Sequence, residues 1–105
     1  MLTPNRGEVW LVDLGYTGKV RPCLVLSVPV EDVDRALVKV VTHTTSPRNS
    51  RFEVRVQPRF LKPGVVDCQN VVTISKAKML RKLGDLPVDD FAKVESKIKE
   101  WLGFV

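Results

Sequence analysis

Short runs rich in β-branched residues recur along most of this chain, and each run ends in a polar or turn-forming stretch. Such runs are typical of strands, and we expect strands at residues 7–14, 22–27, 36–42, 52–56 and 65–74, with a short edge piece at 79–83. The period then changes, because six apolar residues recur at three- and four-residue steps, as on one face of a helix: Val88, Phe91, Val94, Ile98, Trp101 and Leu102. The pattern predicts a mainly β fold, a small antiparallel barrel closed by one C-terminal helix.

The length and composition narrow the class of protein. A chain of 105 residues can bury one modest core, so we expect residues 1–105 to form a single domain. No apolar run is long enough to span a bilayer, and the first residues lack the apolar stretch of a signal peptide, so we expect a cytoplasmic protein without membrane contact. Cys23 and Cys68 have no metal-ligand spacing, and no glycine-rich phosphate loop is present. We therefore expect neither a metal nor a cofactor.

The richest set of chemical groups follows the third predicted strand. Within residues 43–51 lie four hydroxyl side chains, the only histidine and two arginines: Thr44, Thr45, Ser46, Ser50, His43, Arg48 and Arg51. Hydroxyl and guanidinium groups suit a phosphate. Arg21 stands directly before Pro22 and is therefore extended at the start of another predicted strand. Together these residues suggest a site that handles a nucleic-acid backbone.

Three of these residues also have alternative interpretations. Arg21 also fits a surface arginine at a strand end, and Thr44 also fits a turn residue that bonds its own backbone. His43 has an ordinary pKa of about 6.5, which makes it a candidate general acid or base. Strand alternation, however, would place His43 and Thr44 on opposite faces of the sheet.

The charge distribution favours an anionic partner. The net charge is +5, and nucleic acid is the first candidate for such a chain. Residues 44–62 hold five basic residues against one acid, and residues 75–83 hold four basic residues and no acid. A solvated basic surface without a specific partner is the plain alternative.

Five segments, in order along the chain, resemble the MazF/PemK toxins: residues 6–14, 21–27, 44–46, 52–54, and 64–70 together with Thr73 and Ile74. The resemblance covers nearly the whole chain. It implies the toxin of a type II toxin–antitoxin system, a metal-independent, sequence-selective endoribonuclease that cleaves mRNA. It also implies an SH3-like barrel with a C-terminal helix, a homodimer, and an acidic antitoxin as protein partner.

The resemblance also assigns roles to residues. The family's catalytic arginine falls on Arg21 and its catalytic threonine on Thr44. The implied reaction on single-stranded RNA is attack of a ribose 2′-OH on the adjacent phosphodiester, which leaves a 2′,3′-cyclic phosphate and a 5′-OH. Arg21 would stabilise the phosphorane and Thr44 would hold a phosphate oxygen. Further RNA contacts are expected from Thr45, Ser46, Arg48, Arg51, Asp67, Gln69, Asn70, Lys76 and Lys78.

Two departures from the family pattern bear on these roles. The first connection, residues 15–20, is shorter than in many members, which affects contacts to RNA and antitoxin. The family's Asp-Gln pair falls on Gln69-Asn70, and a glutamine cannot take a proton. Proton transfer then rests on Arg21, His43, Asp67 or water.

Two alternative functions share this fold. A CcdB-like toxin binds gyrase and cleaves nothing, and the ending Trp101-Leu102-Gly103-Phe104-Val105 is similar to that group. A catalytically degenerate module that only binds RNA or antitoxin is the other alternative.

Overall fold

The structure, a computed structural model, describes residues 3–15 and 19–104. Residues 16–18 of the first connection therefore lie outside the described part. The elements are β1 (Glu8–Asp13), β2 (Val20–Val25), β3 (Leu37–Thr44), β4 (Glu53–Val56), β5 (Gly64–Ser75), a 3₁₀ turn (Lys76–Lys78), β6 (Met79–Asp85) and α1 (Val88–Leu102). Every predicted strand is present, and the predicted edge piece is a full strand because it pairs along β1. None of the described helices is long and apolar enough to cross a membrane.

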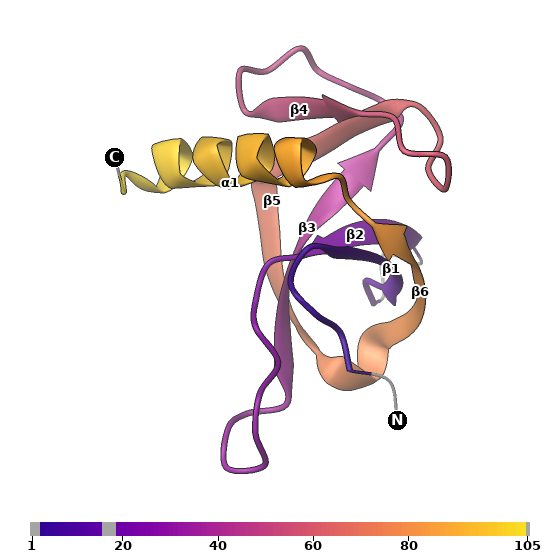
Figure 1. The fold of residues 1–105 in the computed structure, drawn as a ribbon, viewed down its shortest axis with the longest axis vertical. Helices are drawn as coiled ribbons and strands as arrows, with labels where there is room; N and C mark the ends of the chain where they lie inside the picture. The colour runs from indigo at the N-terminus through magenta and orange to yellow at the C-terminus, as the bar shows by residue number, and fades with distance from the viewer. Residues whose placement is uncertain (1–2, 16–18, 105) are drawn as a thin grey trace.

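The strands form one antiparallel sheet in the order β4-β5-β3-β2-β1-β6. The mainly β fold with a C-terminal helix is confirmed. The sheet bends strongly, but its edge strands β4 and β6 do not pair with each other in the described residues, so the predicted barrel is left open. Figure 1 shows α1 lying across β4 and β5 at one end, while β1, β2 and β6 curl together at the other.

Strand alternation gives the molecule two hydrophobic cores, one on each face of the sheet. Val9 and Leu24 point into the first core, which also holds Val94 and Ile98 of α1. Their strand neighbours Trp10 and Cys23 point into the second core, inside the curl. Both faces of β1–β3 are therefore buried for much of their length, which explains the near-continuous apolar runs in the sequence.

A pronounced irregularity bends β5 in the middle. Val41 pairs with Val71, whereas His43 pairs with Val66. Over this step β3 advances by two residues and β5 by five, so β5 carries three extra residues opposite Thr42. Bulges of this kind kink a strand and are frequent beside functional sites. The bend lets one long strand serve both the α1 half and the curled half of the molecule.

The apolar face predicted for α1 is only partly used. Val94 and Ile98 are buried, but Val88, Trp101 and Leu102 are exposed. The N-terminal end stays close to the core, because Leu86 just before it is buried there and Phe91 packs against it, whereas the C-terminal end projects beyond the core. The helix ends at Gly103, which takes a left-handed conformation with φ of 80° and donates its N–H to the last turn.

Glu8 anchors the start of β1 although it is almost buried. Burial alone would raise its pKa, but hydrogen bonds from the Asn5 N–H and the Trp10 indole, together with Lys82 at 3.0 Å, lower the pKa to about 2. The carboxylate therefore stays charged and ties β1 to β6.

Candidate functional site

Strand register brings Arg21 and Thr44 together. Cys23 of β2 pairs with Thr42 of β3, and Leu24 pairs with Val41. The β2–β3 pairing ends at Cys23 and Thr42. Arg21 and Thr44 each lie two residues beyond this pair, so the two-residue period puts both on the same face as Cys23 and Thr42. That face is the inner face of the curl. Arg21 and Thr44 both line the groove described next.

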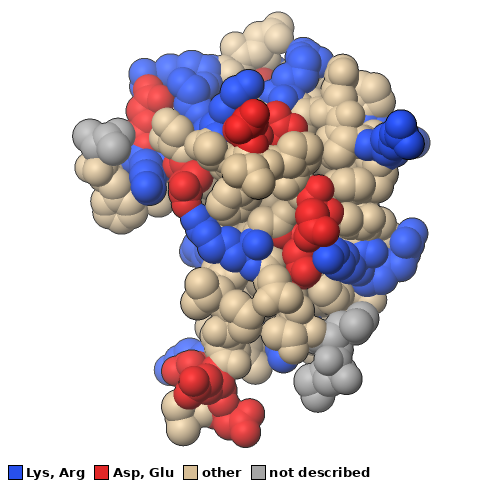
Figure 2. Space-filling model, in the orientation of Figure 1, with Lys and Arg blue, Asp and Glu red and all other residues tan. Residues whose placement is uncertain are grey.

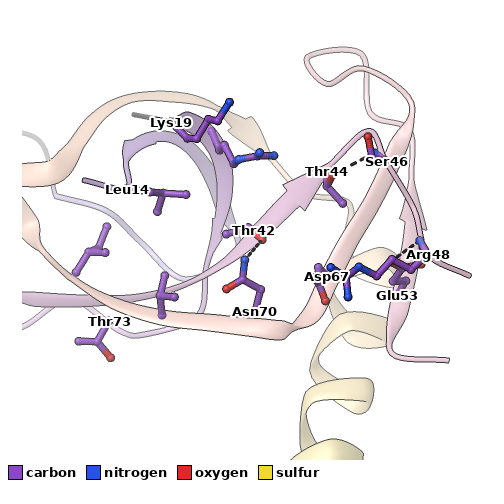
Figure 3. A pocket seen from close by; sticks show the side chains of 13 residues that line it. Leu14, Lys19, Thr42, Thr44, Ser46, Arg48, Glu53, Asp67, Asn70 and Thr73 are labelled. Atoms are coloured by element: carbon purple, nitrogen blue, oxygen red, sulfur yellow. Dashed lines mark hydrogen bonds between the residues drawn. The ribbon is translucent and has the colours of Figure 1, made fainter. Parts of the chain in front are cut away.

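This groove is the open mouth of the curled sheet and has a volume of about 820 Å³. Its floor is apolar, since Leu14, Val72 and Ile74 line it and also pack against the second core. Its rims are polar and carry three basic residues, namely Lys19, Arg21 and Arg48. Figure 3 shows Lys19 on one rim and Arg48 on the other, with Thr44 between them. A cationic rim over an apolar floor suits a chain of phosphates carrying flat bases.

Thr44 is held in a defined orientation. Its Oγ1 accepts a hydrogen bond from the Ser46 N–H at 3.1 Å, as in the turn that the alternative interpretation foresaw. A hydroxyl also has one O–H donor. The turn therefore leaves this donor free for an oxygen in the groove, and the structural and functional roles of Thr44 are compatible.

The remaining groove residues come from β5 and the β3–β4 loop. Asn70 donates from Nδ2 to Thr42 Oγ1 at 2.9 Å, a contact that closes over the extra residues of β5. Asp67, Ser46 and Arg48 also line the groove. In Figure 3 the side chain of Arg48 reaches back toward Asp67. Of the predicted site residues, the groove thus unites Arg21, Thr44, Ser46, Arg48, Asp67 and Asn70.

Several predicted residues lie outside this groove. Arg51 stacks over the Phe52 ring at 4.4 Å and pairs with Glu100 at 3.6 Å. Gln69 is exposed, and its N–H bonds Asp67 Oδ1. Lys76 and Lys78 belong to the 3₁₀ turn, and Lys78 pairs with Asp13 at 3.8 Å.

His43 lies on the other face of β3, as strand alternation predicts. It is 4% exposed, and its Nε2 has no hydrogen-bond partner among the described residues. A Cβ added to Gly64 would lie 2.9 Å from this Nε2, so the ring edge packs directly against Gly64. Burial lowers the pKa of His43, and a backbone hydrogen bond with Lys62 partly opposes this effect. The imidazole is therefore neutral at pH 7.

A second hollow of about 410 Å³ lies on the His43 face and shares Lys19, Arg21 and Thr44 with the groove. Thr45 also lines it. Its remaining lining is largely apolar and comes from β1, β2, β6 and the connection before β5: Leu11, Val20, Pro22, Phe60, Leu61 and Leu83.

Three polar residues of the groove were not predicted from the sequence: Lys19, Thr42 and Glu53. Lys19 and Thr42 each stand two positions before a predicted catalytic residue, so strand alternation would have found both. Glu53 carried no signal in a basic segment, because its role depends on loop contacts.

The two cysteines are buried in different cores. Burial raises the pKa of both thiols to about 12. They are therefore protonated at neutral pH and unsuited to nucleophilic chemistry.

The acidic residues of the β2–β3 connection lie away from the groove. Figure 2 shows them gathered on the projecting tip of the molecule, whereas Lys and Arg predominate around the other end. The tip residues are Glu31, Asp32 and Asp34, and none of them lines the groove.

Comparisons with known proteins agree with this geometry. A family model described as "PemK-like, MazF-like toxin of type II toxin-antitoxin system" matches residues 5–102. Endoribonuclease MazF1 of Mycobacterium bovis is 30% identical over 103 residues, which are 98% of this chain and 96% of the relative. Endoribonuclease MazF4 of Mycobacterium tuberculosis matches with the same identity and coverage.

Solved structures share the whole fold. An endoribonuclease in complex with its cognate antitoxin, from a mycobacterial species, has a TM-score of 0.83 and 28% identity, covering 97% of both chains. MazE-MazF from Deinococcus radiodurans has a TM-score of 0.84 and 25% identity, covering 98% of both chains. With the family model spanning nearly its full length, this chain belongs to the PemK-like, MazF-like toxins of type II toxin–antitoxin systems.

Proposed function

We propose that this chain is a toxin that acts as a sequence-selective endoribonuclease on single-stranded mRNA. Its relatives in two mycobacteria are named endoribonucleases. The observation that carries the proposal is that Arg21 and Thr44, each two residues beyond the last β2–β3 pair, line one groove. Since mRNA is the substrate, we propose that the protein acts in the cytoplasm. We also propose that residues 1–105 form one domain.

The proposed reaction uses the substrate's own 2′-OH as nucleophile. Its oxygen attacks the adjacent phosphorus, the 2′-proton leaves, and the 5′-oxygen departs with a proton, which gives a 2′,3′-cyclic phosphate and a 5′-OH. The Arg21 guanidinium stabilises the charge that develops on the non-bridging oxygens. The free Thr44 O–H donates to one of these oxygens. The 2′-OH supplies the nucleophile and Arg21 supplies the positive charge, so the proposed reaction is metal-independent.

Asp67 is the better placed of the two candidate proton acceptors. Its carboxylate lines the groove with Thr44. The His43 Nε2 instead packs against Gly64, away from solvent. We therefore assign proton transfer to Asp67 or a water molecule beside it, and we assign His43 a supporting role beneath Thr44.

The RNA follows the groove. Ser46, Arg48 and Asn70 contact the nucleotides next to the cleaved bond, since all three line the groove, and Thr45 does so from the adjoining hollow. The predicted residues outside it contact only RNA that continues beyond the groove: Arg51, Gln69, Lys76 and Lys78.

The second hollow supports a homodimer. Its apolar lining is the part of the sheet face that α1 does not cover, and Val20 remains 54% exposed there. We propose that a second copy of the chain covers this face. Because Arg21 and Thr44 line both hollows, the site would then lie at the subunit junction. Sedimentation that detects only an 11.8 kDa species at micromolar protein would contradict the dimer.

An acidic antitoxin is the proposed inhibitor. Related toxins have been solved with a cognate antitoxin or with MazE. An acidic, flexible segment would occupy the basic groove and exclude RNA. The affinity of this complex should fall as salt rises, and an affinity unchanged by salt would contradict the electrostatic part of the proposal.

RNA digestion tests the proposed function. Wild type, Arg21→Ala, Thr44→Ala and the matched control Arg35→Ala, which changes an exposed arginine outside the groove, are compared at equal folded concentration. We expect wild type and the control to cut RNA, and both site variants to lose most activity. If wild type cuts nothing, or both site variants cut normally, the assignment fails and the gyrase-binding or non-catalytic alternative is favoured.

A further inference from the structure

Glu53 holds the loop that carries two groove residues. The loop, residues 45–52, joins β3 to β4, and Glu53 is the first residue of β4. Both carboxylate oxygens accept from the Arg48 N–H, at 3.1 and 3.0 Å, and Oε1 also accepts from the Ser50 N–H at 3.2 Å. One side chain thus fixes two backbone positions of the loop.

The backbone that Glu53 holds determines the direction of the Arg48 side chain. Asn49, between the two bonded amides, is left-handed with φ of 62°, a conformation that non-glycine residues rarely adopt. The loop turns sharply there and sends the Arg48 side chain into the groove (Figure 3). Without the carboxylate, the Arg48 N–H would have no protein partner among the described residues.

The Glu53 carboxylate is unexpected in a groove proposed to bind RNA, because it is negatively charged like the phosphates. Glu53 pairs with Asp67 across β4 and β5, and both line the groove. Two like charges opposite each other on a sheet are unfavourable, and both repel a phosphate. The Glu53 carboxylate accepts hydrogen bonds from the Arg48 and Ser50 N–H groups, which partly neutralise its charge.

We propose that Glu53 is a positioning residue, whose carboxylate fixes residues 48–50 so that Arg48 grips a phosphate of the bound RNA. The proposal rests on the proposed function for the identity of the ligand. Glu53 itself does not touch the RNA.

Double-mutant kinetics test the proposal. Glu53→Ala should raise the KM for RNA roughly 10-fold, because Arg48 is no longer positioned to bind a phosphate. We expect little change in kcat, since this contact is remote from the cleaved bond. Glu53→Gln should behave like wild type, since one amide oxygen can accept both backbone bonds as Oε1 does. In an Arg48→Ala background, Glu53→Ala should add nothing further. Glu31→Ala, on the acidic tip, serves as the matched control.

Three results would overturn the proposal. Equal damage from Glu53→Gln and Glu53→Ala would mean that the charge matters and not the loop contacts. Additive effects of Glu53→Ala and Arg48→Ala would mean that the two residues act independently. A fall in kcat at constant KM would assign Glu53 a chemical role.

Two further measurements separate this proposal from the proposed function. Affinity for single-stranded RNA, measured with Arg21→Ala as background, reports the grip without cleavage. Amide hydrogen exchange at Arg48 and Ser50 reports the loop contacts alone. We expect Glu53→Ala to weaken RNA binding and to speed exchange at these two amides. Unchanged affinity or unchanged exchange would refute the positioning role even if wild type cuts RNA, and absence of cleavage with both effects present would refute only the nuclease assignment.

Discussion

The two walls of the groove are built in different ways. Arg21 and Thr44 stand on neighbouring strands whose register is set by buried pairs such as Cys23 and Thr42. Ser46 and Arg48 stand on an exposed loop that one carboxylate holds. The strand wall is fixed by the cores, whereas the loop wall is fixed locally. We propose that the strand wall carries the chemistry and that the loop wall binds the phosphates. Substitutions in the strand wall should therefore lower kcat, whereas substitutions in the loop wall should raise the KM.

The largest effect is expected from the strand wall, at Arg21. Arg21→Lys keeps the charge but loses the planar fork of donors. We expect kcat to fall roughly 100- to 1,000-fold, as for loss of a preorganised donor. Single-turnover cleavage of an RNA oligonucleotide measures the loss, with Arg35→Lys, at an exposed arginine outside the groove, as the matched control. Normal cleavage by Arg21→Lys would show that charge alone suffices.

Gly64→Ala tests how tightly the strand wall is packed. The added Cβ would lie 2.3 Å from the Thr44 carbonyl oxygen and 2.9 Å from His43 Nε2, so β3 and β5 must separate. We expect a loss of about 1–3 kcal/mol in the free energy of unfolding, together with reduced cleavage because Thr44 moves. Urea unfolding and cleavage at equal folded concentration measure both. Unchanged stability would contradict the close packing at the end of β3.

A smaller effect is expected from the loop wall. Arg48→Ala removes one proposed phosphate contact, so the KM should rise roughly 10-fold while kcat changes little. The slope of log affinity against log salt should fall by about 0.7, the value for one contact to a single strand. Arg35→Ala should leave the slope unchanged. A loss of kcat instead would place Arg48 among the chemical residues.

The smallest effect concerns His43 and pH. Because its pKa is lowered in the folded protein, the unfolded chain binds more protons below pH 6.5. The contribution of His43 to stability is therefore complete above that pH and declines as pH falls, by at most about 1.4 kcal/mol per unit. Urea unfolding of wild type and His43→Phe between pH 7.5 and 5 measures the difference. The same slope in both proteins would contradict the assignment.

Most of the fold could be predicted because its signals are local. β-branched runs mark the strands, and a change of period marks α1. Closure of the barrel could not be predicted, since whether β4 meets β6 depends on the bend of the whole sheet. The exposure of Trp101 was also hidden, because a helix's apolar face does not reveal how much sheet lies beneath it.

The site was predictable where alternation and resemblance act together. Arg21 and Thr44 came from the family resemblance, and alternation separated Thr44 from His43 as the structure does. Lys76 and Lys78 were also expected to contact RNA, and the structure leaves them outside the groove. The role of Glu53 could not be predicted, because its three hydrogen bonds to the loop backbone depend on the folded loop and on no sequence pattern.

The three extra residues in β5 offer a route by which such toxins can diversify. They lie at the point where the long strand passes from the α1 half to the curled half, and Asn70 is one of the residues beside them. An insertion or deletion there would tilt one half against the other while the paired segments on both sides kept their partners. We therefore expect a change of length at this point to alter the width of the groove while Arg21 and Thr44 keep their places on β2 and β3.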